Sequence, residues 1–215
     1  MNKKITVGII LSGCGNKDGS EIHESVLTML AIDQLGESYV CYAPHIDQHH
    51  VTNHATGKET EDKRNALVEA ARIARGKITP LNEFDARTVD AVIFPGGLGA
   101  ATTLSNFAYE GAKGKVHKDV ERVIRNMASL KKPMGALCIA PPLFARVLDN
   151  PTITIGNDQT TQAKLEAMGA KHVNTLSGEI AIDREHKLVT APCYMHNTSI
   201  ATIAIEAKKV VEAVI

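Results

Sequence analysis

Apolar residues recur along this chain in two patterns that alternate. Short β-rich apolar runs predict strands at residues 5–11, 39–43, 89–94, 134–137 and 152–155. Apolar residues spaced three and four apart predict helices at 20–35, 61–75, 117–130, 160–168 and 198–214. Strands that alternate with helices indicate an α/β protein, with a mostly parallel sheet covered by helices on both faces.

One pair of strands breaks this alternation. Residues 180–182 and 188–191 flank a short polar turn and predict one antiparallel hairpin added to the sheet. No linker, repeat or low-complexity segment interrupts the 215 residues. We therefore expect residues 1–215 to form a single domain with one core.

The strand at 134–137 runs directly into Cys138, and a helical pattern follows at once. A strand, a sharp turn with small neighbours and then a helix is the pattern of a nucleophile elbow. Pro141 and Pro142 fall in the first helical turn, where proline is tolerated. N–H groups at the helix start are expected to favour the thiolate. The alternative is a buried structural cysteine at a strand end.

A glycine pair follows another predicted strand. The carboxyl ends of parallel strands share one edge of a sheet, so Gly96 and Gly97 are expected near Cys138. Their N–H groups, with that of Ile139 after the cysteine, could form an oxyanion hole. The alternative is a plain turn between a strand and a helix.

Two carboxylates begin the first predicted helix. Glu21 and Glu24 are three residues apart and so lie near one face. A carboxyl group close to a thiolate has a raised pKa and can serve as a general acid and base. The alternative is that both face solvent and complement the helix dipole, and we favour this for Glu21.

The nine histidines include four in the polar loop at residues 44–57, with no spacing typical of a zinc site. We expect no metal and no cofactor. Within this loop Asn53 and His54 are candidate pocket residues, as is Cys14 in a glycine-rich loop after the first strand. Glu21 is a fourth candidate for the pocket.

Composition limits the partners. The net charge is +0, no tryptophan is present, and no apolar stretch is long enough for a membrane span. We therefore expect no nucleic-acid and no membrane partner. The four scattered cysteines suggest reduced thiols, which leads to the prediction of a cytoplasmic protein.

Three strings in the chain resemble the ThiJ/PfpI superfamily of class I glutamine-amidotransferase-like proteins: 18–24 (DGSEIHE), 94–101 (FPGGLGAA) and 137–141 (LCIAP). Further strings are similar to one branch, the ElbB family, named for enhancing lycopene biosynthesis and described as isoprenoid-biosynthesis glyoxalases. They include 10–15 (ILSGCG), 104–108 (LSNFA) and 189–192 (VTAP).

The resemblance implies a flavodoxin-like three-layer sandwich and a homodimer. It also implies Cys138 as nucleophile, Glu24 as its acid partner and the Gly96–Gly97 loop as oxyanion donor. Three departures stand out: Ile139 replaces the histidine of superfamily peptidases, no late His-x-Glu pair is present, and residues 156–158 (GND) lack the histidine of related deglycases. Without a triad we expect neither ammonia release from glutamine nor proteolysis.

A dyad of Cys138 and Glu24 suits a weakly active, glutathione-independent glyoxalase, a lyase that converts small dicarbonyls such as methylglyoxal and glyoxal to hydroxy acids. The other class is non-enzymatic: a redox sensor or regulatory scaffold, linked to isoprenoid metabolism or stress, in which Cys138 is oxidised reversibly.

Overall fold

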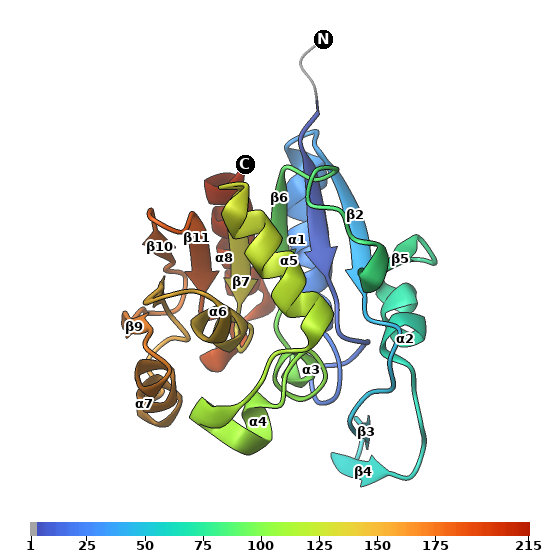
Figure 1. Ribbon diagram of the computed structural model, residues 1–215. Helices are drawn as coiled ribbons and strands as arrows, with labels where there is room; N and C mark the ends of the chain where they lie inside the picture. The colour runs from blue at the N-terminus through green and yellow to red at the C-terminus, as the bar shows by residue number, and fades with distance from the viewer. Residues whose placement is uncertain (1–3) are drawn as a thin grey trace.

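A computed structural model describes residues 4–215. A seven-stranded sheet runs through the molecule in the order β10-β11-β7-β6-β1-β2-β5, with helices on both faces (Figure 1). The strands of this sheet are β1 (Thr6–Ile10), β2 (Ser38–Ala43), β5 (Ile78–Pro80), β6 (Ala91–Phe94), β7 (Met134–Leu137), β10 (Ala181–Asp183) and β11 (Leu188–Ala191). Within this sheet β10 pairs antiparallel with β11, and all other pairs are parallel. The predicted α/β class and the predicted hairpin are both confirmed.

The helices form two layers with separate apolar cores. On one face α1 (Ile22–Gln34), α2 (Ala66–Ile73) and α8 (Ile200–Val214) pack on the sheet. On the other face lie α3 (Leu98–Thr102), α5 (Lys118–Ser129) and α6 (Pro141–Val147), with α4 (Phe107–Glu110) and α7 (Gln159–Ala167) beside them. Three 3₁₀ helices complete the set, at Leu81–Glu83, Gly111–Lys113 and Cys193–Met195.

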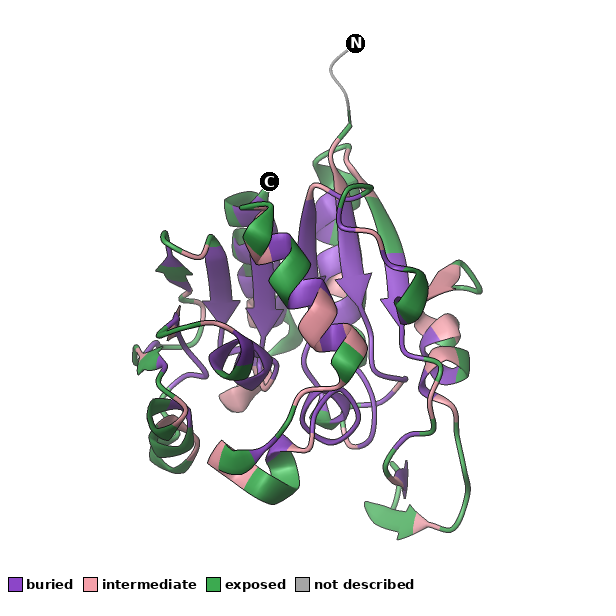
Figure 2. Cartoon of the chain, viewed as in Figure 1, coloured by how far each residue is buried: buried purple, intermediate pink, exposed green. Residues whose placement is uncertain are grey.

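The central strands explain the unbroken apolar runs of the sequence. Every residue of β6, β7 and β11 is buried, as the purple arrows of Figure 2 show. Parallel strands covered on both faces need apolar side chains in both directions, so they lose the alternating pattern of half-buried strands. The register pairs Phe94 with Ala136 and Leu137 with Ala191. The strands β6, β7 and β11 therefore end at the same edge of the sheet, next to Cys138.

Three differences between the predicted and the observed elements are larger than one or two residues or change the pairing. The helix predicted at 61–75 begins only at Ala66, because the Asn65 side chain accepts the N–H groups of Leu67 and Val68 and so caps it. The strand predicted at 152–155 is shortened to β8 (Thr152–Ile153), which pairs with β9 (Lys171–His172) outside the main sheet. The polar loop 44–57 contributes β3 (Val51–Asn53), paired with β4 (Lys58–Thr60).

No helix within residues 4–215 is long and apolar enough to cross a membrane.

The edge strand β5, which the sequence did not predict, has three half-buried residues and ends in Pro80. Proline cannot donate to a ladder and is found on edge strands, so this strand carries little of the usual strand pattern.

Candidate active site

Cys138 occupies a strained turn between β7 and α6. Its φ is +55, in the left-handed region that residues other than glycine seldom adopt. The turn is fixed on both sides, because the Cys138 N–H donates to the Ala191 carbonyl and the Ala140 N–H donates to the Leu137 carbonyl. Pro141 and the following proline occupy the first two positions of α6. The geometry is that of a nucleophile elbow, with the thiol placed beyond the carboxyl ends of β6, β7 and β11.

Gly96 lies where the thiol and a buried carboxyl group meet. A Cβ added at Gly96 would lie 2.4 Å from Cys138 Cβ and 2.8 Å from Glu24 Oε2. The next residue is equally confined, since a Cβ at Gly97 would lie 2.4 Å from the Glu21 nitrogen. Side chains are therefore excluded from both positions, and the two glycines let α1 approach the elbow closely.

Glu24 is completely buried beside the thiol. Its Oε2 accepts the Gly96 N–H at 2.8 Å, while its Oε1 has no hydrogen bond of ordinary geometry within residues 4–215. Burial, and then the like charge of Glu21, raise the pKa of Glu24 to about 8; the Gly96 and Tyr194 N–H groups and the Cys138 thiol oppose this. Glu24 is therefore mostly protonated at neutral pH.

The sequence-based expectation that the thiolate of Cys138 is favoured is wrong in direction. Burial, and then the charge of Glu24, raise the pKa of Cys138 well above its ordinary value, although the Gly97 and Ile139 N–H groups lower it. The helix start cannot offset burial here, because Pro141 and Pro142 have no N–H groups to offer. The ionisation of Cys138 therefore depends on transfer of its proton to a neighbour.

The three predicted oxyanion donors divide into two groups. The N–H groups of Gly97 and Ile139 donate to the Cys138 sulfur. The oxygen of an adduct would be bonded to the carbon next to that sulfur, and so would lie close to both donors. The N–H of Gly96 is already used by Glu24. The N–H of Gly96 is therefore not free for an oxyanion. Gly96 contributes to the site by donating to the carboxyl group of Glu24 and by leaving space where a side chain would clash.

Glu21 is not the solvent-facing carboxylate that the sequence favoured. The residue is 8% exposed, and its Oε2 accepts the Glu24 N–H at 2.7 Å, so Glu21 is the N-cap of α1. The preceding residue, Ser20, accepts the Ser12 N–H and so ties together the two ends of the loop between β1 and α1. Glu21 therefore stabilises the first turn of α1 and also contributes negative charge beside Glu24.

A cavity of about 810 Å³ opens above Cys138. Most of its lining residues were not assigned to the site from sequence, among them Lys17, His23, Tyr194 and His196. His23 Nδ1 and the Tyr194 hydroxyl are 2.8 Å apart, and His196 Nε2 donates to the Thr175 carbonyl at 3.0 Å. The one available signal was the hairpin, because it makes β11 parallel to β7 and so brings residues 193–198 to the same edge.

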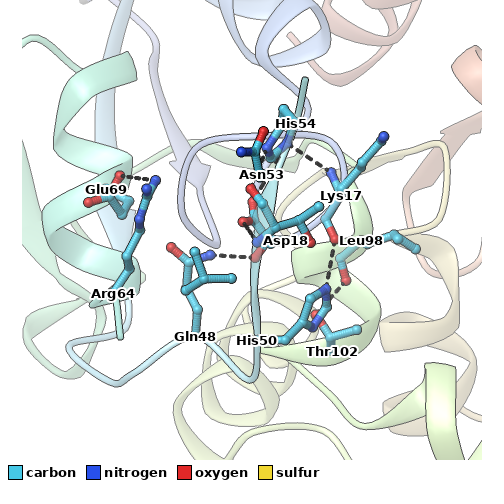
Figure 3. Close-up of polar contacts among 12 residues, drawn as sticks. Lys17, Asp18, Gln48, His50, Asn53, His54, Arg64, Glu69, Leu98 and Thr102 are labelled. Carbon is cyan, nitrogen blue, oxygen red and sulfur yellow. Dashed lines mark hydrogen bonds and ion pairs between the residues drawn. The ribbon is translucent and has the colours of Figure 1, made fainter. Parts of the chain in front are cut away.

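Three of the candidate pocket residues lie elsewhere. Asn53 and His54 line a separate hollow of about 330 Å³, because they belong to β3 and the turn after it (Figure 3). Cys14 is absent from the lining of the Cys138 cavity, and burial, followed by the charge of Glu69, raises its pKa. Within residues 4–215 no cluster of three His, Cys, Asp or Glu side chains could hold a metal ion.

Comparison with known proteins yields close relatives. The ES1 protein homolog, mitochondrial, of Rattus norvegicus is 42% identical over 204 residues, covering 90% of this chain and 77% of the relative. The human glutamine amidotransferase-like class 1 domain-containing protein 3, mitochondrial, is also 42% identical, with 90% and 76% covered. No model of a protein family matches the chain. The chain belongs to the ES1 family.

Solved structures with the same fold are also similar to this chain. An isoprenoid biosynthesis protein with amidotransferase-like domain from Ehrlichia chaffeensis has a TM-score of 0.91 at 29% identity and covers 98% of each chain. DJ-1beta of Drosophila melanogaster has a TM-score of 0.59 at 16% identity, covers 99% of this chain and 91% of its own, and shows the shared fold. The flavodoxin-like fold and the ThiJ/PfpI superfamily inferred from the sequence are therefore supported.

The predicted cytoplasmic location is contradicted by the ES1 relatives. The rat and human proteins, and the Danio rerio ES1 protein at 32% identity, are all named as mitochondrial. The prediction rested on unpaired cysteines, and all four are free in the structure. Free thiols argue against an oxidising compartment but do not distinguish among the others, which is why the inference failed.

Proposed function

We propose that this ES1-family protein catalyses a glyoxalase-type conversion of 2-oxoaldehydes to 2-hydroxy acids, with Cys138 as nucleophile and Glu24 as general acid and base. The observation that supports this most is the contact of a thiol with a buried carboxyl group whose pKa is raised to about 8. A general acid and base works best when its pKa lies near the operating pH, because it can then both accept and release a proton.

The reaction needs no redox partner. The ionised form of Glu24 takes the thiol proton, the sulfur of Cys138 adds to the aldehyde carbon, and Glu24 returns the proton to the aldehyde oxygen, which gives a hemithioacetal. Glu24 then removes the proton from that carbon and returns one to the adjacent carbon through an enediol, which leaves a thioester. Water hydrolyses the thioester, so that the hydroxy acid leaves and the thiol is restored. Methylglyoxal and water together give lactate.

The N–H groups of Gly97 and Ile139 are suited to stabilise the oxygen of the adduct. Both already act on the Cys138 sulfur, so an oxygen on the carbon bonded to that sulfur would lie within their reach. The Gly96 N–H keeps Glu24 Oε2 in place during the proton transfer.

The non-enzymatic alternative draws less support. Redox-sensing cysteines are accessible and have a low pKa. Cys138 is 7% exposed and its pKa is raised well above the ordinary value. We also propose that the chain lies close to the ElbB branch, which the Ehrlichia structure supports by its description as an isoprenoid biosynthesis protein. The homodimer remains a prediction from the resemblance.

The test is consumption of methylglyoxal and glyoxal by the wild type and by Cys138→Ser and Glu24→Gln. We expect Cys138→Ser to lose all measurable turnover. Glu24→Gln should lose about 10²- to 10⁴-fold, as is typical when a general acid–base group is removed. Cys41→Ser and Glu69→Gln are the controls, since each changes another buried thiol or carboxyl group outside the Cys138 cavity. Equal rates in the wild type and in Glu24→Gln would refute the dyad.

A further inference from the structure

Lys17 lines the cavity above Cys138 and forms no ion pair with any residue of the described range 4–215. An ammonium group donates three hydrogen bonds and attracts anions. A small uncharged dicarbonyl offers no anionic group that the Lys17 ammonium could bind. The proposed reaction with such a substrate therefore assigns no role to this charge.

The polar loop at residues 44–57 is here called the histidine-rich segment. Two of its histidines form hydrogen bonds with the backbone of Lys17, as Figure 3 shows. The Lys17 N–H donates to His54 Nε2 at 3.4 Å, and the Lys17 carbonyl accepts from His50 Nε2 at 2.9 Å. The next residue is anchored as well, since Asp18 Oδ2 accepts the Thr52 N–H at 2.7 Å. The histidine-rich segment thus holds the loop that carries the lysine.

The same loop is tied to the glycine loop beside the thiol. The Leu98 N–H donates to the Asn16 carbonyl at 2.8 Å, and the Gly99 N–H donates to the Gly19 carbonyl at 2.9 Å. Gly97, one of the donors to Cys138, lies in this glycine loop. The backbone of Lys17 is therefore held relative to the loop that contacts the reacting sulfur, and a fixed backbone helps a side chain to orient a substrate.

The Lys17 ammonium lies beside the turn between β3 and β4. A Cβ at Gly57, in that turn, would lie 3.0 Å from Lys17 Nζ. Lys17 is half-buried, whereas Cys138 is 7% exposed, so the two residues line the cavity at different depths.

The cavity is large compared with a three-carbon substrate. Its volume of about 810 Å³ falls within the range of roughly 300–1,000 Å³ that is typical of pockets for much larger ligands. A small dicarbonyl bonded to Cys138 would leave most of this space, and the charge of Lys17, without a contact.

We propose, building on the proposed function, that the substrate is a larger 2-oxoaldehyde that carries an anionic group. Its aldehyde carbon reacts at Cys138, and its carboxylate or phosphate binds the Lys17 ammonium. Lys17 is then a specificity-determining residue, and His50 and His54 are positioning residues that act through its backbone. A charged contact of this kind should strengthen recognition of the anionic substrate and leave neutral ones unaffected.

The experiment uses phenylglyoxal and 4-carboxyphenylglyoxal, which differ only in the carboxylate. Initial rates are measured before the reagents modify arginine side chains. The wild type should have the higher kcat/KM for the carboxylated compound. Lys17→Met should lower that value by about 10- to 100-fold, leave phenylglyoxal and methylglyoxal within about 2-fold, and Lys17→Arg should restore most of the loss. Lys58→Met, in β4, is the control for loss of a nearby lysine.

A binding experiment separates this inference from the proposed function. The affinities of 4-acetylbenzoate and acetophenone, which lack the aldehyde, are measured by calorimetry on wild type and Lys17→Met. Selective loss of 4-acetylbenzoate binding in Lys17→Met would support the anion site even if no dicarbonyl is turned over. The inference is overturned if wild type shows no preference for either anionic compound, or if Lys17→Met weakens neutral and anionic compounds equally.

Discussion

Cys138 and Glu24 lie against each other beside Gly96, where any side chain on residue 96 would clash with both. A single methyl group there would lie 2.4 Å from Cys138 Cβ and 2.8 Å from Glu24 Oε2. The glycine thus allows the thiol and the carboxyl group, which are far apart in sequence, to share one small space. The raised pKa values of both groups follow from that proximity and from burial.

Gly96→Ala should therefore abolish activity at a moderate cost in stability. The added methyl group must push the thiol and the carboxyl group apart, and overpacking of this kind typically costs about 1–3 kcal/mol. We expect at least a 100-fold loss of dicarbonyl turnover, because a shift of about 1 Å is enough for such a loss. Urea unfolding and dicarbonyl consumption are measured on the same samples.

Gly36→Ala is the control for Gly96→Ala. Gly36 has a φ of +77 with nothing within 4 Å of an added Cβ, so alanine there brings backbone strain without a clash. It should lower stability by about 1 kcal/mol and leave turnover unchanged. If Gly96→Ala retained wild-type turnover, the close contact of Cys138 with Glu24 would not be needed for the reaction.

The sequence predicted the fold and the central pair of the site well, for identifiable reasons. Buried parallel strands are read from unbroken apolar runs, and the turn at Cys138 is read from a strand that meets a helix without a linker. The pairing of Cys138 with Glu24 came from the resemblance, because no local pattern relates residues so far apart. Burial decides their pKa values, and burial is a property of the packed molecule.

The outer part of the site could not be predicted in the same way. Tyr194 and His196 reach the cavity only because β11 is parallel to β7, which is a matter of topology. Asn53 and His54 looked like pocket residues because they are polar and lie in a loop. In the structure His54 accepts the Lys17 N–H, and Asn53 and His54 both line a separate hollow and not the Cys138 cavity.

Dimerisation is predicted to involve α1 and α8. Ile22, Val26 and Leu30 are 43%, 46% and 47% exposed and recur at intervals of four along α1, and Ile205 of the adjacent α8 is 52% exposed. Exposed apolar surface of this kind is typical of an interface. Leu30→Glu should convert the dimer to a monomer in sedimentation experiments, whereas Val68→Glu on α2 should not. A monomeric wild type would refute the homodimer.

Glu24→Gln should change how stability depends on pH. The pKa of Glu24 is about 8 in the folded protein and 4.5 ordinarily, so between these values the folded state keeps a proton that the unfolded state releases. Stability from this group is thus fully present below about pH 4.5, falls as the pH rises toward 8, and then levels off. The total loss is roughly 4–5 kcal/mol as an upper bound.

The measurement compares urea unfolding of the wild type and of Glu24→Gln from pH 5 to 8.5. The difference in unfolding free energy should shift in favour of the variant by several kcal/mol across this window, because glutamine does not titrate. Other titrating groups are common to both proteins and cancel. A difference that stays constant with pH would show that the pKa of Glu24 is the same in the folded and unfolded states.

Alkylation of Cys138 by iodoacetamide should report the same carboxyl group from the side of the thiol. Below about pH 8 both groups hold their protons, and once Glu24 ionises it can take the proton from the thiol. The rate should therefore rise through about pH 8 and then level off.

Glu21→Gln removes the second cause of the raised pKa of Glu24, while its amide oxygen can still accept the Glu24 N–H. This variant should move the rise to lower pH, and Glu24→Gln should eliminate it. An unshifted profile in Glu21→Gln would mean that burial alone raises the pKa of Glu24.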